Sequence, residues 1–327
     1  MNRNILLCVA LLAADLRAAD TNALVFVKTI PLPEVRGRID HFALDAESQR
    51  LFVAALGNDT VEVIDVSANR RIHSIGECST PQGVAFVSGA NRLFIANGGS
   101  GKVKMLDGAN YRTLKSIGDL PDADNMRYDA KAGLIYVGYG DGTLAVIGAT
   151  NGELIASIKL AGHPESFQLE KAGQRIFVNV PDANQVAVVD REKRAVIATW
   201  PMGKFHSNFP MALDESNHRL FAGCRHPARL VVLDTADGRI VDDVSIASDT
   251  DDVFYDTNRR QIYVSCGGVF IDVIGQRDAD HYPLLEQVPT SAGARTSYYA
   301  EAQDKLYLAV RAGTFSNRAE IRVYQPQ

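Results

Sequence analysis

Short alternating runs of apolar and polar residues recur along most of this chain, and they predict β-strands. Glycine, asparagine or aspartate interrupts these β-branched and aromatic runs about every 8–12 residues, which is typical of a β-meander. Patterns of amphipathic helices are almost absent. One strand recurs in seven similar copies, at Arg50–Ala54, Arg92–Ala96, Leu134–Gly138, Arg175–Asn179, Arg219–Gly223, Gln261–Ser265 and Lys305–Ala309.

The spacing of these copies indicates a repeat protein. Their second residues serve as markers, and these are Leu51, Leu93, Ile135, Ile176, Leu220, Ile262 and Leu306. Successive markers are 42, 42, 41, 44, 42 and 44 residues apart, and each repeat is expected to hold four short strands. Seven such repeats predict an all-β fold, a seven-bladed β-propeller with four-stranded antiparallel blades.

The two ends of the repeat region complement each other. The last repeat reaches Glu320–Tyr324 and stops one strand short, whereas residues 23–30 form a strand with no repeat before it. We expect the N-terminal strand to complete the last blade, because this closure removes two exposed sheet edges. Residues 20–327 are therefore expected to form a single propeller domain.

The first residues are typical of a secretory signal peptide. Arg3 precedes an apolar run at positions 5–14, and the small pair Ala18-Ala19 follows. We predict a signal peptide over residues 1–19 and a mature protein that is periplasmic or secreted. The apolar run is too short to span a bilayer, so no membrane insertion is expected after cleavage. An uncleaved N-terminal helix and lipidation at Cys8 are the alternatives.

The composition is that of an ordinary globular protein, and we expect a monomer. The chain has 327 residues, 46% of them hydrophobic, and a net charge of −5. These values exclude a disordered chain and offer no basic field for nucleic acid.

The cysteines restrict the chemistry further. Outside the predicted signal peptide they are Cys78, Cys224 and Cys266, and no Cys-x-x-Cys motif is present. A zinc ribbon, a thioredoxin-like centre and an attached c-type haem are therefore not expected. Cys224 and Cys266 occupy the same position in adjacent repeats, where packed thiols are favoured over a disulfide or a soft-metal site.

The repeat also resembles a known family. The run Arg50–Ala54, the pair Ile64-Asp65 and the run Ile262–Ser265 are similar to bacterial YVTN-type, YncE-like propellers. The resemblance covers residues 23–327 and implies the seven-bladed fold. The lactonase-like propeller superfamily includes exported proteins of unknown role, lactonase-like enzymes, lyases and redox-enzyme propellers, so the resemblance selects no single activity.

Equivalent positions can be compared around the ring, because the first strand of each blade lines the central channel. Counting eleven and ten residues back from the markers yields dissimilar, mostly polar pairs, which we predict at one channel mouth. These pairs are Asp40-His41, Gln82-Gly83, Asp124-Asn125, Glu165-Ser166, Phe209-Pro210, Asp251-Asp252 and Arg295-Thr296. Neighbouring loops add Arg38, His163, His206, Asn208, Arg225 and His226. Divergent polar groups around one concavity favour an asymmetric ligand, and solvation or backbone capping is the alternative at each position.

Five of the predicted mouth residues are carboxylates. Their mutual repulsion raises carboxyl pKa values unless a positive charge relieves it. Arg38, Arg127 and Arg295 are the candidate counter-charges. A divalent cation such as Ca²⁺ or Mg²⁺ is the other solution, and the nearby histidines make a transition metal conceivable. No compact ligand spacing identifies a metal, so its ligands stay unassigned.

Three functions remain open. The leading hypothesis is an exported, non-catalytic propeller that binds a small ligand or a periplasmic protein at the channel mouth. The motifs of serine hydrolases, zinc proteases and P-loop enzymes are absent. The second is a lactonase-like hydrolase or lyase, with or without a divalent metal, and the third is an accessory subunit of a periplasmic redox enzyme. For the second, the candidate acid–base residues are Asp40, His41, Glu165, His206, Asp251 and Asp252.

Overall fold

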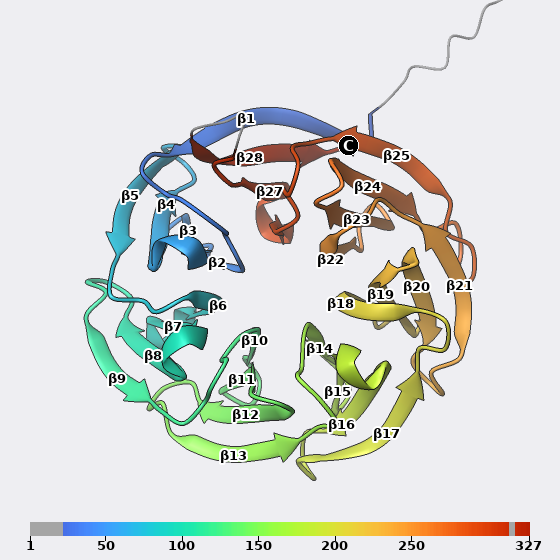
Figure 1. The fold of residues 1–327 in the computed structure, drawn as a ribbon, viewed down its shortest axis with the longest axis horizontal. Coiled ribbons are helices and arrows are strands. Elements are labelled where there is room, and N and C mark those ends of the chain that lie inside the picture. The colour runs from blue at the N-terminus through green and yellow to red at the C-terminus, as the bar shows by residue number, and fades with distance from the viewer. Residues whose placement is uncertain (1–21, 314–317) are drawn as a thin grey trace, which may run out of the picture.

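Seven four-stranded antiparallel sheets are arranged around a central axis, as Figure 1 shows. The computed structural model describes residues 22–313 and 318–327, and the predicted signal peptide with Cys8 lies outside them. The predicted seven-bladed propeller is confirmed. In the described ranges the only helical elements are 3₁₀ turns, η1 (Leu56–Asn58), η2 (Ser88–Ala90), η3 (Gly98–Ser100), η4 (Pro181–Ala183) and η5 (Glu301–Gln303). None of the described helices has the length and apolar character needed to cross a bilayer.

In the first three blades the strands run in chain order from the axis outward. Blade 1 contains β2 (Phe42–Asp45), β3 (Arg50–Ala55), β4 (Thr60–Asp65) and β5 (Arg70–Ile75). Blade 2 contains β6 (Pro81–Val87), β7 (Arg92–Asn97), β8 (Lys102–Asp107) and β9 (Thr113–Ile117). Blade 3 contains β10 (Met126–Asp129), β11 (Leu134–Tyr139), β12 (Thr143–Gly148) and β13 (Leu154–Lys159).

The next three blades repeat this order. Blade 4 contains β14 (Phe167–Leu169), β15 (Arg175–Val180), β16 (Gln185–Asp190) and β17 (Ala195–Pro201). Blade 5 contains β18 (His206–Asp214), β19 (Arg219–His226), β20 (Ala228–Asp234) and β21 (Ile240–Ser245). Blade 6 contains β22 (Thr250–Asp256), β23 (Gln261–Cys266), β24 (Phe270–Gly275) and β25 (Leu284–Pro289).

Blade 7 joins the two ends of the chain. It contains β26 (Ser297–Ala300), β27 (Lys305–Val310), β28 (Ala319–Pro326) and, as its outer strand, β1 (Leu24–Leu32). The antiparallel register runs from the pair Leu24 and Pro326 to the pair Leu32 and Ala319. Figure 1 shows β1 in blue beside β28 in red, which agrees with the predicted ring closure.

The middle strands are apolar on both faces because each blade is covered by two neighbours. In β3, Leu51 and Val53 pack with residues of blade 7, whereas Phe52 and Ala54 pack with residues of blade 2. All four are fully buried. Successive side chains of a strand point to opposite faces, so one short strand contributes to two separate cores.

Aspartates at the turn between the third and fourth strands stabilise that turn. Asp65 Oδ1 accepts hydrogen bonds from the backbone N–H groups of Ser67 (3.0 Å) and Ala68 (2.8 Å). Such side-chain bonds recur at Asp107, Asp190 and Asp234. These Asx turns account for the repeated aspartate without any functional role.

An arginine connects blades 1 and 2 near the end of the innermost strand. Arg50 donates to Asp45 in its own blade at 2.7 Å. The same guanidinium donates to the Gly108 carbonyl at 2.6 Å and to the Tyr111 hydroxyl at 3.0 Å, both in blade 2. Five-donor arginine is suited to this bridging because its planar group can serve several acceptors at once.

The three described cysteines are buried free thiols. Cys78, Cys224 and Cys266 are at most 2% exposed. Cys224 and Cys266 pack within hydrophobic clusters, in agreement with the interpretation as packed thiols. Burial raises the pKa of the Cys78 thiol to about 11 and that of Cys224 to about 12.

Candidate functional site

The residues directly before the innermost strand of a blade lie at equivalent depths in the channel. The Asp40 N–H donates to the Ala54 carbonyl (2.7 Å), and the Ala54 N–H donates to the His41 carbonyl (3.0 Å). The same exchange of backbone bonds occurs at Asp124-Asn125 and at Glu165-Ser166. The equivalence obtained by counting back from the markers therefore holds in these three blades. We call the position eleven residues before each marker the mouth level and the next position the middle level.

Carboxyl groups from four blades gather at the mouth level. His41 Nε2 lies 3.8 Å from Asp40 Oδ1 and 3.7 Å from Asp124 Oδ1, although these aspartates belong to blades 1 and 3. Burial, followed by the charge of Asp124, raises the pKa of Glu165 to about 8, and Asp251 adds to this effect. The predicted acidic residues thus form one cluster rather than separate surface groups.

Burial raises the pKa of several of these carboxyl groups. Burial and then the charge of Asp124 raise the pKa of Asp40 to about 7. Burial also raises the pKa of Asp251, and it raises that of Asp252 well above the ordinary range. Groups that titrate near pH 7 can both donate and accept a proton under physiological conditions.

Three arginines offset part of the negative charge. Arg38 Nη2 lies 2.8 Å from Asp40 Oδ2. Asp251 pairs with two arginines, Arg225 at 2.6 Å and Arg295 at 3.0 Å. The predicted counter-charges Arg38 and Arg295 therefore lie beside the carboxylates, and Arg225 joins them.

His163 stands beside the cluster with a defined orientation. Its Nδ1 lies 2.7 Å from the Gly140 carbonyl, which can only accept, so Nδ1 carries a hydrogen. Its Nε2 lies 4.0 Å from Asp124 Oδ2. Interaction with the Asp124 carboxylate is the largest of the effects that raise the pKa of His163 to about 9. The other oxygen of this carboxylate, Asp124 Oδ1, is buried without a hydrogen-bond partner in the described residues.

A chain of hydrogen bonds leads from Arg127 to His41 through Asn125. Arg127 Nη1 donates to Asn125 Oδ1, and Asn125 Nδ2 lies 3.0 Å from His41 Nε2. Because the amide oxygen faces the arginine, the amide N–H faces His41, whose Nε2 must accept. Burial lowers the pKa of His41, which agrees with a neutral ring protonated at Nδ1.

Inside the mouth, the channel contains a cavity of about 350 Å³. Its polar wall includes Arg127, Gln168 and Asp252. Its apolar wall includes Phe254 and Tyr298, whose rings stand nearly perpendicular with centroids 6.1 Å apart. The cavity is in the size range of small-molecule sites and combines apolar walls with a few polar groups, as such sites do.

The shape of this cavity follows from the lower level of the channel, eight residues before each marker. Each of these residues pairs with the aromatic third residue of the recurring strand. The seven are Ala43, Ala85, Arg127, Gln168, Ala212, Phe254 and Tyr298. The adjacent alanines of blades 1 and 2 leave open the space that aromatic rings fill at the equivalent positions of blades 6 and 7.

Four predicted site residues lie apart from the acidic cluster. Gln82 bonds to the Asp122 carboxylate, and Asn208 is buried against Asn179 Oδ1 at 2.8 Å. His206 and His226 face each other at the end of the β18–β19 ladder, where both are exposed. Neither histidine has a hydrogen bond or ion pair with the cluster among the described residues.

Residues of the lower level were not predicted as ligand contacts, except that Arg127 was a candidate counter-charge. They can be found in the sequence by counting eight residues back from each marker, where the repeats carry small, charged, polar and aromatic side chains. The mouth and middle levels indicate a site in the sequence because they are rich in carboxylates. Alanine and phenylalanine at the lower level are equally typical of a hydrophobic core.

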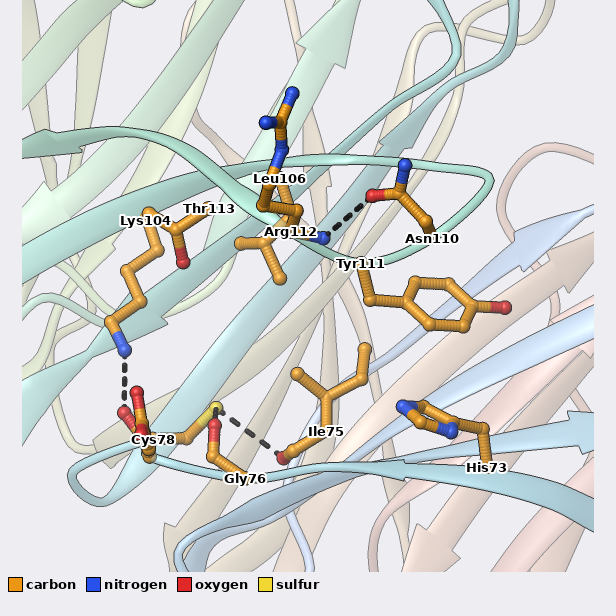
Figure 2. A pocket seen from close by; sticks show the side chains of 11 residues that line it. His73, Ile75, Gly76, Cys78, Lys104, Leu106, Asn110, Tyr111, Arg112 and Thr113 are labelled. Carbon is orange, nitrogen blue, oxygen red and sulfur yellow. Dashed lines mark hydrogen bonds between the residues drawn. The ribbon is translucent and has the colours of Figure 1, made fainter.

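A second pocket, of about 400 Å³, lies outside the channel between blades 1 and 2. Figure 2 shows His73 and Tyr111 on one side and Lys104 with Cys78 on the other. The rings of His73 and Tyr111 stack at 5.0 Å, and Lys104 Nζ donates to the Glu77 carbonyl. None of the predicted site residues lines this pocket.

A divalent metal is one of the open alternatives for the acidic mouth, and the described part of the chain identifies no ligand set for it. There, no group of three or more histidine, cysteine or acidic side chains is arranged to hold an ion. The mouth carboxylates instead contact arginines and histidines, as described above.

Comparisons with known proteins identify the fold and nothing finer. No family model matches the chain, and no curated protein matches its sequence. Among solved structures, hydrazine synthase from Kuenenia stuttgartiensis superposes with a TM-score of 0.74 over 88% of this chain and 97% of that chain. At 14% identity, this similarity shows that both chains share the propeller fold.

Proposed function

We propose that this protein is a non-catalytic binding propeller that holds a small polar ligand in its central channel. The observation that carries the proposal is the pair Arg127 and Asp252. Both line the 350 Å³ cavity and attract each other electrostatically, yet no direct ion pair joins them in the described structure. A half-buried cation and a half-buried carboxyl group that do not contact each other leave both available to a ligand.

The asymmetry of the channel supports the same function. Seven equivalent positions of the lower level carry alanine, arginine, glutamine, phenylalanine and tyrosine. If these positions served only the fold, the same residue type could recur in every blade, as aspartate recurs at the turn between the third and fourth strands. A ligand with distinct polar and apolar parts accounts for the difference between the walls.

A binding screen tests this proposal. Purified protein is heated with a panel of small acids, amines, sugar acids and lactones, and native mass spectrometry records any retained compound. We expect at least one class to raise Tm and to be retained, and Arg127→Gln or Asp252→Asn to reduce that effect. The proposal fails if no class shifts Tm and the unfolded protein releases no small molecule, or if the only retained partner is another protein.

The mouth favours one alternative, a lactonase-like hydrolase. Asp40 and Glu165 have pKa values of about 7 and 8, suited to a group that activates water. In this reaction water adds to the lactone carbonyl, the ring C–O bond breaks and the ring oxygen gains a proton. Incubation with a lactone panel and titration of the released acid distinguishes the two functions. Turnover that Glu165→Gln abolishes, while Glu192→Gln leaves it intact, would replace the binding proposal.

We also propose export and YncE-like membership, on sequence patterns alone. The positively charged start and the apolar run at positions 5–14 support export, and the recurring Arg50–Ala54 type of strand supports the family. Fractionation of expressing cells with N-terminal sequencing tests export. Cytoplasmic protein that retains Met1–Ala19 contradicts it.

A further inference from the structure

We propose that the channel ligand is a small monocarboxylate with an aromatic or apolar body, whose carboxylate binds Nε and Nη2 of Arg127. This inference rests on the proposed binding function and specifies its ligand. It follows from three features of the cavity: the hydrogen bonds that Arg127 leaves unmade, the absence of a paired anion, and the shape of the apolar wall.

The first feature is the bonding of the guanidinium. Arg127 Nη1 donates to Asn125 Oδ1 and to the Met126 carbonyl, so both of its hydrogens are used. Nη2 makes one long contact of 3.3 Å with Ser166 Oγ, and Nε has no partner in the described residues. Nε and Nη2 form one edge of the planar group, which matches the two oxygens of a carboxylate.

The second feature is the charge balance. No carboxylate of the described chain lies within 4.0 Å of the Arg127 guanidinium, and its ring contact with Phe167 is also neutral. Asp252 accepts a hydrogen bond from the Ser297 N–H at 2.7 Å, and burial raises its pKa well above the ordinary range. A half-buried positive charge that no carboxylate contacts directly favours a ligand that brings one negative charge.

The third feature is the shape of the cavity beside the arginine. Ala43 and Ala85 leave open a space that faces the rings of Phe254 and Tyr298. Planar apolar groups pack well against such rings. The volume of about 350 Å³ accommodates a ring as well as a carboxylate, and the body of the ligand then occupies the alanine side.

Isothermal titration with benzoate as the probe tests the proposal, with benzyl alcohol and benzylammonium as neutral and cationic analogues. We expect benzoate to bind more tightly than either analogue. Arg127→Gln is expected to weaken benzoate binding by roughly 10-fold to 100-fold, as loss of a charge-assisted hydrogen-bonded pair does. Arg127→Lys keeps the charge without the two-pronged edge and is expected to recover only part of the affinity. Arg92→Gln, outside the channel in blade 2, is the matched control and leaves binding unchanged.

A second variant keeps the test independent of the folding of the arginine variants. Ala43→Tyr is expected to fill the cavity without disturbing the blade, because Tyr298 occupies the equivalent position in blade 7. It is expected to abolish benzoate binding while circular dichroism shows an unchanged β-sheet spectrum.

The outcomes separate the two proposals. Benzoate binding that Arg127→Gln does not weaken overturns the carboxylate assignment. Binding of benzylammonium or benzyl alcohol, but not benzoate, that Ala43→Tyr blocks overturns it too and leaves the binding function standing. Absence of binding by all three probes overturns the carboxylate assignment, and the compound screen then decides the broader function separately.

Discussion

Arg127 and Asp252 line one cavity from blades 3 and 6 and do not form an ion pair in the described structure. Each is held instead by neutral groups, the arginine by Asn125 and the carboxyl group by the Ser297 N–H. In a core built for stability alone, even a half-buried cation without a direct ion-pair partner is costly. The arrangement therefore distinguishes Arg127 from the channel-mouth arginines, which contact carboxylates directly; these are Arg38, Arg225 and Arg295.

The contact between blades 1 and 2 predicts a large effect for one arginine. Arg50→Ala removes bonds to Asp45, Gly108 and Tyr111 and leaves a buried carboxylate, so it is expected to cost about 3–4 kcal/mol of unfolding free energy. Arg92 occupies the same repeat position in blade 2, but its contact with Asp107 is 4.0 Å long. Arg92→Ala is therefore expected to cost less than about 1 kcal/mol. Urea denaturation measures both, and equal losses would contradict the assignment.

Ring closure predicts different effects for two apolar residues of β1. Ile30 is fully buried in the cluster between blades 7 and 1, whereas Val27 is 46% exposed. Ile30→Ala is expected to destabilise the protein by about 2–4 kcal/mol, and Val27→Ala by no more than about 0.5 kcal/mol. Urea denaturation of both variants provides the measurement. A small loss for Ile30→Ala would show that β1 contributes little to holding the ring shut.

Burial of the thiols predicts that native protein resists thiol reagents. Only the thiolate reacts quickly, and burial raises the pKa values of Cys78, Cys224 and Cys266. In a Cys8→Ser variant, an aromatic disulfide reagent at pH 8 is expected to modify less than about 0.1 thiol per chain within minutes. All three thiols become reactive in guanidinium chloride. Rapid modification of a native thiol would show that its blade opens locally.

The mouth cluster predicts that stability falls as the pH rises. The pKa of Glu165 is raised to about 8, by burial first and by Asp124 next, so the folded state binds this proton more tightly than the unfolded state. Its contribution is full below the unfolded pKa near 4.5 and is lost as the pH rises through about 8. His163, with a pKa raised to about 9, acts in the same direction, whereas His41, with a lowered pKa, opposes both.

Comparison with a variant isolates the contribution of Glu165. Between pH 5 and pH 9 the wild-type protein is expected to lose about 1–3 kcal/mol more stability than Glu165→Gln. Urea denaturation at both pH values measures the difference. Glu192→Gln, at an exposed turn, is expected to behave like the wild type. A variant as pH-dependent as the wild type would remove Glu165 from the coupled cluster.

The blades could be predicted from sequence because their determinants are local. The recurring strand alternates in a way that places Leu51 and Phe52 on opposite faces, and its aromatic third residue returns in all seven copies. Ring closure was also predictable. The last repeat lacks one strand and residues 23–30 supply one extra strand, so pairing the two ends leaves no free sheet edge.

The content of the channel was only partly predictable. The carboxylates at Asp40 and Asp124 were expected to converge, because equivalent positions of a ring meet at its axis. The histidines His206 and His226 were expected there too, but the β18–β19 ladder continues past Phe209 and ends with both of them exposed.

Arg127 shows where sequence reasoning stops. The sequence shows an arginine at this position, but it does not show that the nearby carboxylates make their direct contacts with other residues. The unpaired state arises because Asp124 turns toward His41 and His163, while Asp252 bonds to Ser297. Those contacts depend on side-chain directions in five different blades, which no local pattern encodes.

Because β1 pairs with β28, the two ends of the propeller lie side by side, and the arrangement of the blades does not depend on which strand comes first in the chain. Since Leu24 faces Pro326 across one ladder, a short linker can join these strands while new termini are opened at an exposed turn such as the one after Asp190. Such a circularly permuted chain is expected to form the same seven-bladed ring, with its termini in blade 4.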